Sequence, residues 1–214
     1  MSASESDPQA GVVGFQLSAL RAYGGEPGTI AGVGFWPRVA ARVIDLLAHL
    51  MVAFCAGFLF TILLVIAAGG HPDRMLILKL RQTTLASFVL ALLGSIAYHT
   101  ICEGLHGSTL GKLMLSLVVV QEDGSPCRLR GALIRSLAYL LDGLFFGLIG
   151  YSAMQKTVQQ QRHGDEWAHT MVCKRSNAPR KSSRSGGRFA MALLFGMMAD
   201  AALIITGLLL KVMA

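Results

Sequence analysis

The chain has 214 residues, of which 53% are hydrophobic and only 14% are charged, whereas typical soluble domains are about 25% charged. This composition and the clustering of the apolar residues exclude an ordinary soluble domain and predict an integral membrane protein. The formal net charge of +7 does not indicate nucleic-acid binding. The basic residues lie beside apolar segments, where anionic lipid headgroups and membrane topology account for them.

The N-terminal segment, residues 1–31, is polar and glycine-rich and contains Glu5 and Asp7. It lacks the basic start and apolar core of a cleavable signal peptide. We therefore expect a flexible cytoplasmic tail, followed by a membrane domain over residues 32–174.

The first apolar segment, Val43–Ala68, exceeds the roughly 18–20 residues that cross a bilayer as a helix. Four ionisable residues precede or enter it at spacings that return to one helix face: Arg38, Arg42, Asp45 and His49. An Asp or Arg at the centre of a membrane helix costs about 2.5–3.5 kcal/mol to insert, so this polar stripe should face protein.

Two interpretations of the polar stripe stay open at this point. A buried ion-pair ladder would fix helix packing, because buried charges normally pair. A proton or cation path is the usual functional hypothesis for ionisable groups inside a membrane.

The second apolar segment, Leu85–Cys102, ends in a polar cluster of His99, Glu103 and His106. The Glu-x-x-His spacing occurs in helix-bundle metal sites, but such sites need the motif twice and further carboxylates. We therefore predict a cluster that hydrogen-bonds to the stripe, and no metal or cofactor.

The region after this cluster predicts a small cytoplasmic sheet. Leu115–Val120 is rich in β-branched residues, "EDGSP" is a turn signal, and Thr170–Cys173 is a second short strand. The preceding "GSTLGK" is one residue too short for a phosphate-binding loop, and no Ser or Thr follows Lys112. We expect a tight turn that places Lys112 at the lipid headgroups.

Leu133–Met154 matches a span in length, but it contains Arg135, Asp142 and three glycines. The stretch "GALIRSLAYLLDGL" aligns without gaps with "GFWPRVAARVIDLL" of the first segment, so Arg135 and Asp142 repeat the spacing of Arg38 and Asp45. Transporters are often built from such repeats. The second copy is therefore a candidate counterpart of the stripe.

A basic linker, residues 175–188, precedes an additional transmembrane helix within residues 189–214. We expect the linker to contact anionic lipid headgroups. Asp200 stands alone among apolar residues of the last span, and we expect it to contact another helix or subunit, or to lie near an interface.

The positions of Lys and Arg favour a re-entrant Leu133–Met154. If this segment returns to its own side, fifteen of the 19 Lys and Arg residues lie inside and four lie outside, as the positive-inside rule requires. The predicted fold is an all-α transmembrane, polytopic helical bundle with three full spans, one re-entrant or fourth span, and a small cytoplasmic β element. We expect a multi-pass protein of the cell membrane with a cytoplasmic N-terminus.

Three stretches together resemble the RDD family of bacterial membrane proteins: "GFWPRVAARVIDLL", "GSTLGKLMLSLVVV…EDGSP" and "RHGDEWAHTMV". The resemblance covers roughly residues 32–174. It matches Arg38, Asp45 and Asp165 to the arginine and the two aspartates that name the family, and it includes Gly111-Lys112 and Thr170. It implies that Asp165 and Lys112 lie at the cytoplasmic end of the stripe. We predict that Asp165 pairs with Arg38 or Arg42.

The resemblance implies a fold more firmly than an activity. One candidate function is a small transporter of ions, such as a monovalent cation/proton antiporter, in which Asp45, His49 and Asp142 carry the ion. It would work as a homo-oligomer, because so few spans enclose little space. The alternative is a non-transporting scaffold or regulatory subunit of a membrane protein complex. We find no nucleophile–base set and expect no enzyme activity.

Overall fold

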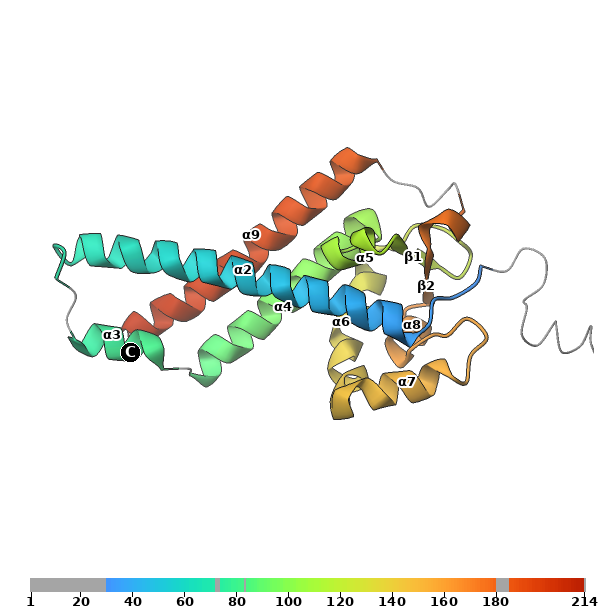
Figure 1. The fold of residues 1–214 in the computed structure, drawn as a ribbon, viewed down its shortest axis with the longest axis horizontal. Coiled ribbons are helices and arrows are strands. Elements are labelled where there is room, and N and C mark those ends of the chain that lie inside the picture. The colour runs from blue at the N-terminus through green and yellow to red at the C-terminus, as the bar shows by residue number, and fades with distance from the viewer. Residues whose placement is uncertain (1–29, 72–73, 83, 180–184, 214) are drawn as a thin grey trace, which may run out of the picture.

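The computed structural model describes residues 30–71, 74–82, 84–179 and 185–213. The predicted N-terminal tail therefore lies outside the described residues except for positions 30 and 31, and so do positions 180–184 of the basic linker. The described chain is mainly helical (Figure 1).

Three described helices are long and apolar enough to cross a membrane: α2 (Phe35–Ala67), α4 (Leu85–His106) and α9 (Gly186–Met213). They contain the three full spans predicted from the sequence, and each helix extends beyond the apolar segment. α2 has 33 residues and is roughly 50 Å long at 1.5 Å per residue, so it exceeds the roughly 30 Å hydrocarbon core. Its first turns, which carry Arg38, therefore extend beyond the apolar segment.

Local sequence explains where these helices begin and end. Pro37 lies in the first turn of α2, where a helix needs no backbone N–H donor. α4 starts with a capping box between Thr84 and Ser87 and stops at Gly107, whose φ of 87° is left-handed. A short helix, α3 (Arg74–Arg81), joins α2 to α4 and was not predicted.

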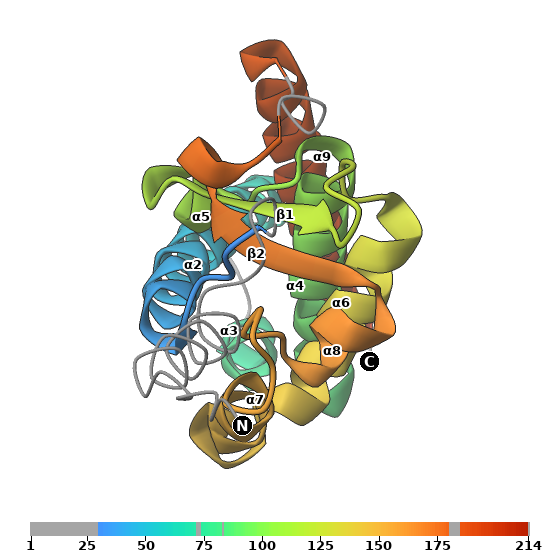
Figure 2. The same ribbon diagram turned by 90° about the vertical axis from the view of Figure 1, so that its right-hand side faces the viewer.

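The two predicted strands form an antiparallel pair, β1 (Leu117–Gln121) and β2 (Thr170–Lys174), with Val119 opposite Val172. Backbone N–H of Val33 donates to the carbonyl oxygen of Val172 at 2.8 Å, so the segment before α2 lies beside β2. Figure 2 shows the strands lying across one end of the helices. We call this the sheet end; it also holds the short helices α5 (Leu110–Met114) and α8 (His163–Trp167).

Both faces of the sheet are buried. Leu117, Val119 and Val172 pack with Ala41 and Ala132 of neighbouring helices. The residues that alternate with them on the strands form a second core cluster: Val118, Val120, Met171 and Cys173. The alternation of side chains along a strand thus places an apolar surface on each side.

The segment predicted as re-entrant or as a fourth span is broken. α6 (Leu129–Asp142) is followed by a 3-10 turn, η1 (Leu144–Gly147), and by α7 (Leu148–Met154). The 14 residues of α6 span roughly 21 Å, which is too short to cross a bilayer. α7 returns towards the start of α2, where the rings of Tyr151 and Phe35 lie 5.2 Å apart. The structure thus favours the re-entrant form.

The additional helix α9 packs along α4 through glycines. A Cβ at Gly196 would lie 3.1 Å from Cys102 Sγ, and a Cβ at Gly94 would collide with the Asp200 carboxylate. These close approaches require residues without side chains. α9 ends beside α3, at the end of the bundle opposite the sheet (Figure 1).

Candidate functional site: a charge network and a cavity

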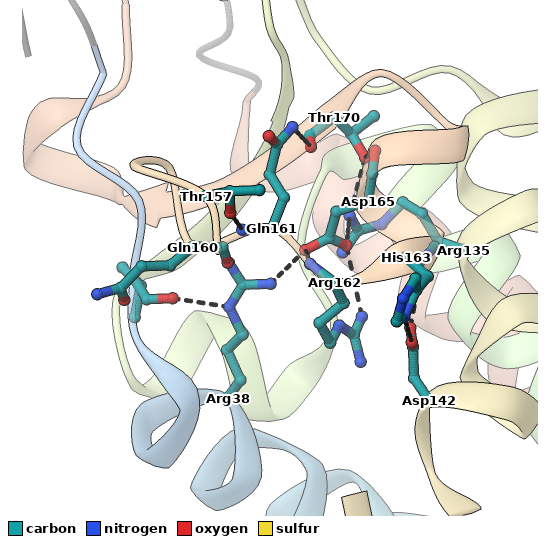
Figure 3. Close-up of polar contacts among 12 residues, drawn as sticks. Arg38, Arg135, Asp142, Thr157, Gln160, Gln161, Arg162, His163, Asp165 and Thr170 are labelled. Carbon is teal, nitrogen blue, oxygen red and sulfur yellow. Dashed lines mark hydrogen bonds and ion pairs between the residues drawn. The ribbon is translucent and has the colours of Figure 1, made fainter. Parts of the chain in front are cut away.

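Asp165 is the centre of a buried charge network at the sheet end. Its carboxylate pairs with the guanidinium groups of Arg38 from α2 and Arg135 from α6, and Arg162 lies 3.6 Å away. Figure 3 shows these side chains around the carboxylate. The predicted pairing of Asp165 with Arg38 is confirmed, and Arg135 is a second partner that the sequence did not reveal.

Ionisation of Asp165 is favoured although the residue is fully buried. Burial alone would raise the pKa of the carboxyl group, but Arg135 and Arg38 outweigh burial and hold this pKa well below its usual range. Arg38 also donates to the carbonyl oxygens of Val33 and Gln160, each at 2.8 Å. The start of α2 is therefore fixed to α8 and to the loop before it.

Glu103 extends the network to α4. Its carboxylate pairs with Lys112 of α5 and accepts a hydrogen bond from Arg135 Nε at 2.9 Å. Lys112 is only 8% exposed, so the prediction that placed it at the lipid headgroups is wrong. Burial lowers the pKa of Lys112, and the Glu103 carboxylate offsets only part of this effect. The Lys112 side chain points inwards because it pairs there with the buried Glu103 carboxylate.

Asp45 lies beside α5, surrounded by hydrogen-bond donors. Its carboxylate accepts from Thr109 Oγ1 at 2.6 Å, from Gly111 N–H at 2.8 Å and from the Tyr98 hydroxyl at 3.1 Å. His99 Nε2 lies 3.6 Å from Asp45 Oδ2. The carboxylate therefore holds the N-terminal end of α5 against α2.

The "GSTLGK" stretch now has a structural role. Thr109 caps α5 by accepting from Lys112 N–H, and its hydroxyl donates to Asp45. Gly111 lies against α2 so closely that a Cβ would collide with the carbonyl oxygen of Ala41. The motif docks α5 on α2.

His49 joins the first span to the last one. His49 Nδ1 lies 2.7 Å from Oδ2 of Asp200, which is on α9. The expected contact of Asp200 with another helix is therefore present. Asp200 lies outside residues 32–174, the stretch that resembles a known family.

Arg42 stacks on an aromatic ring of α6. Its guanidinium carbon lies 3.8 Å from the centre of the Tyr139 ring, and that of Arg162 lies 5.5 Å from the same centre. The four stripe residues thus reach four different elements: α8 for Arg38, α6 for Arg42, α5 for Asp45 and α9 for His49. The stripe therefore faces protein, and Arg38 and His49 contact carboxylates of other elements, as the interpretation of buried ion pairs that fix helix packing expects.

The second copy of the Arg-x6-Asp spacing has other partners. Asp142 lies 3.1 Å from His163 Nδ1 and accepts the backbone N–H of Gly164 at 3.3 Å, while Arg135 belongs to the Asp165 network. Figure 3 shows the Asp142–His163 contact beside that network. Arg135 and Asp142 thus repeat the spacing of Arg38 and Asp45 in the sequence, but they do not repeat the contacts of those two residues.

The polar cluster at the end of α4 divides among three places. His99 approaches the stripe at Asp45, whereas Glu103 pairs with α5 and α6. His106 Nε2 lies 2.8 Å from Arg175 Nη2. Among these contacts only His99 approaches the stripe, and its Nε2, 3.6 Å from Asp45 Oδ2, has no hydrogen-bond partner in the described structure. The predicted hydrogen bonding of the cluster to the stripe is therefore not found among them. Within the described part of the chain, no group of three or more His, Cys, Asp or Glu is placed to hold a metal ion.

A cavity of about 500 Å³ lies beside these charges, between α2, α6 and α7. Its apolar wall includes Phe35, Val39 and Met154. Its lining also includes eight charged residues: Arg38, Arg42, Asp45, Glu103, Lys112, Arg135, Asp142 and Arg162. The sequence predicted several of these as stripe residues but gave no sign that they enclose a space, because the loop that brings Arg162 is distant in sequence.

Fold and site together define a polytopic helical membrane protein with a buried charge network and a cavity at one end of its spans. The profile of the RDD family matches residues 33–169, which is more than half of the chain, and the chain belongs to that family. The match contains Arg38, Asp45 and Asp165 and ends before α9. Searches of the curated proteins and of the solved structures each gave no significant match.

Proposed function

We propose that this protein is a small proton-linked transporter of the cell membrane. The observation that carries the proposal is the cavity of about 500 Å³, which is lined by Asp45 of the first span. Cavities of roughly 300–1,000 Å³ hold small ligands, and ionisable groups inside spans mark ion and proton paths. In such a transporter the cavity is the solute site and has no catalytic role.

Two carboxylate–imidazole pairs along α2 support a proton route. Asp45 lies 3.6 Å from His99, and one helical turn further His49 lies 2.7 Å from Asp200. Four residues rise roughly 6 Å along a helix. Ionisable groups that face protein inside spans mark proton paths, so two such pairs on successive turns are candidate steps of a proton route. Asp45 links the route to the cavity.

The distribution of basic residues supports a cytoplasmic sheet end, and with it a cytoplasmic N-terminus. Arg74, Lys79 and Arg81 belong to α3 and Lys211 to the end of α9, both opposite the sheet (Figure 1). The other fifteen of the 19 Lys and Arg residues belong to the N-terminal segment, the sheet end or the linker. The positive-inside rule therefore favours a sheet on the cytoplasmic side. Three spans enclose little space, so the transporter would act as a homo-oligomer.

Ion flux in proteoliposomes tests the function. Purified protein is given a gradient of Na⁺, K⁺ or phosphate, and a trapped pH-sensitive dye reports proton movement. We expect the wild type to move protons with one of these ions and Asp45→Asn to lose at least about tenfold in rate, because an amide cannot carry the proton.

His49→Gln provides a second test, since it leaves the hydrogen bonds around Asp45 in place. Glu122→Gln, at the exposed sheet end, is the matched control that removes a carboxylate elsewhere. Size-exclusion profiles establish that each variant is folded. Wild-type rates in both Asp45→Asn and His49→Gln would contradict the proton route.

A scaffold or regulatory subunit is the second candidate. It is favoured by the ion pairs that join α2, α4, α5, α6 and α8 through Asp165 and Glu103, since such a clamp stabilises a rigid surface for a membrane partner. A folded wild type that moves no proton with any of the ions tested would leave this function as the better one.

A further inference from the structure

The acceptor groups that line the cavity are already in use. Asp45 accepts from three donors, Glu103 pairs with Lys112 and Arg135, and Asp142 accepts from Gly164 beside His163. A cation that entered this cavity would find each carboxylate engaged with protein donors.

The donor groups are in surplus. None of the described side-chain hydrogen bonds and ion pairs involves Arg42, whose guanidinium carbon lies over the Tyr139 ring, 3.8 Å from its centre. Arg162 Nε and Arg135 Nη2 are buried in the described structure without a hydrogen-bond partner. Arg135 itself is only 2% exposed. Unpaired donors of this kind are costly unless a ligand satisfies them.

The charge balance of the lining residues also favours an anion as the ligand. Five lining residues are Arg or Lys and three are Asp or Glu. Asp165 lies behind the wall and neutralises Arg38 and Arg135 in part. Arg162 Nη2 lies 3.6 Å from Asp165, but Arg162 Nε has no hydrogen-bond partner in the described structure. Arg42 and the Nε side of Arg162 are therefore the donors that can receive an anion.

The geometry around Tyr139 suits a phosphoryl group. Stacking on an aromatic ring holds a guanidinium in a fixed orientation and leaves its N–H groups free, and guanidinium forks match phosphate oxygens in pairs. The guanidinium groups of Arg42 and Arg162 lie over one tyrosine ring and come from two elements that border the cavity, α2 and the loop before α8.

We propose that this cavity binds a phosphoryl oxyanion between Arg42 and Arg162, with Arg135 Nη2 as a further donor. The rest of the ligand lies against the apolar wall, where Val43 and Leu46 are also exposed on the outer surface of α2. A soluble phosphate monoester and a phospholipid headgroup share this chemistry. The inference rests on the proposed function in that it names the solute class of the same cavity.

Binding to the full-length protein tests the inference. One arm titrates detergent-purified, delipidated protein with inorganic phosphate and with phenyl phosphate and follows intrinsic fluorescence and melting temperature. The other arm places the protein in nanodiscs of phosphatidylcholine with or without phosphatidylglycerol and detects retained lipid by native mass spectrometry.

The variants are Arg42→Gln and Arg162→Gln, and the matched control is Arg130→Gln, an exposed arginine near the start of α6 that does not line the cavity. We expect each cavity variant to weaken binding about tenfold or more, because a charge-assisted hydrogen bond contributes at least that factor. The control should bind as the wild type does. Equal melting temperatures without ligand show that the variants are folded.

Each outcome of these binding measurements either supports the anion site or overturns it. Binding of phenyl phosphate that depends on Arg42 supports a soluble ligand, and retention of phosphatidylglycerol that depends on Arg42 supports a lipid headgroup. No binding in either arm, or binding that Arg42→Gln and Arg162→Gln leave unchanged, overturns the inference. Binding without proton flux would retain the anion site and reject the transporter, whereas flux without anion binding would do the reverse.

Discussion

At the scale of single residues, buried carboxylates organise the protein by satisfying donors from different elements. Asp165 neutralises two arginines that belong to α2 and α6, and Asp45 fixes the start of α5. A buried ion pair contributes little against a well-packed apolar alternative, but removing one partner leaves an uncompensated charge. Each of these carboxylates should therefore be far more sensitive to substitution than an exposed acid.

We predict that Asp165→Asn destabilises the folded protein by about 3–5 kcal/mol, since the variant keeps the shape of the side chain but leaves Arg38 and Arg135 without their anion. The melting temperature in detergent at pH 7 measures the effect. Glu166→Gln, at the next position, is the control and should melt close to the wild type. Equal melting of both variants would exclude Asp165 as the centre of the network.

The pH dependence of this difference follows from the depressed pKa of Asp165. A carboxyl group whose folded pKa is below its unfolded value, about 3.9, contributes stability that is complete above that value and is lost as the pH falls through the folded pKa. The gap between the wild type and Asp165→Asn should therefore stay constant from pH 5 to pH 8. A gap that shrinks between pH 8 and pH 6 would contradict a strongly depressed pKa.

The sequence showed part of this network. The family resemblance indicated that Asp165 pairs at the base of the first helix, because it matched both residues to one motif. Arg135 was assigned to a second stripe from its spacing with Asp142, yet it pairs with Asp165 and Glu103. Spacing within a helix gives the face of a residue, whereas the partner depends on which loop reaches that face.

At the scale of elements, glycines decide which helices approach closely. Gly111 lets α5 lie on α2, and Gly94 and Gly196 let α9 lie on α4. The strand pair was predicted correctly and the re-entrant form of Leu133–Met154 was favoured, since β-branched residues, turn residues and the placement of Lys and Arg can be read locally. The packing of α9 on α4 was not predicted, because small residues in an apolar helix indicate close packing but not which helix packs there.

We predict that Gly196→Cys cross-links α9 to α4 through native Cys102. A Cβ at position 196 would lie 3.1 Å from Cys102 Sγ, close to the spacing that an S–S bond of about 2.05 Å gives between a Cβ and the opposite sulfur. After mild oxidation, trypsin cleavage at exposed Lys174 or Arg175 should leave the two fragments joined on a non-reducing gel.

Phe195→Cys is the matched control, because Phe195 is neighbouring but exposed on the surface of α9. Its fragments should separate under the same conditions. Cross-linking of Phe195→Cys as efficient as that of Gly196→Cys would show that α9 does not hold the described face towards α4.

At the scale of the whole molecule, the broken segment decides the topology. With α6 and α7 confined to the sheet end, three spans carry the chain from that end to the opposite one, where α9 finishes beside α3. A fourth crossing would separate α8 and β2 from β1 by a membrane, which the pairing of β1 with β2 forbids. The sequence left both topologies open because Leu133–Met154 has the length of a span, and the β1–β2 pairing together with the contact of α7 with the start of α2 removes that ambiguity.

We predict that the sheet end faces the cytoplasm, and labelling of Lys174→Cys tests this. Lys174 is the exposed last residue of β2, so a membrane-impermeant maleimide should react with the variant only after cells are permeabilised. Neighbouring Cys173 gives no background at neutral pH, since burial raises the pKa of its thiol to about 11. His71→Cys, exposed between α2 and α3, is the control and should react in intact cells. Labelling of Lys174→Cys from outside intact cells would place the sheet on the other side of the membrane.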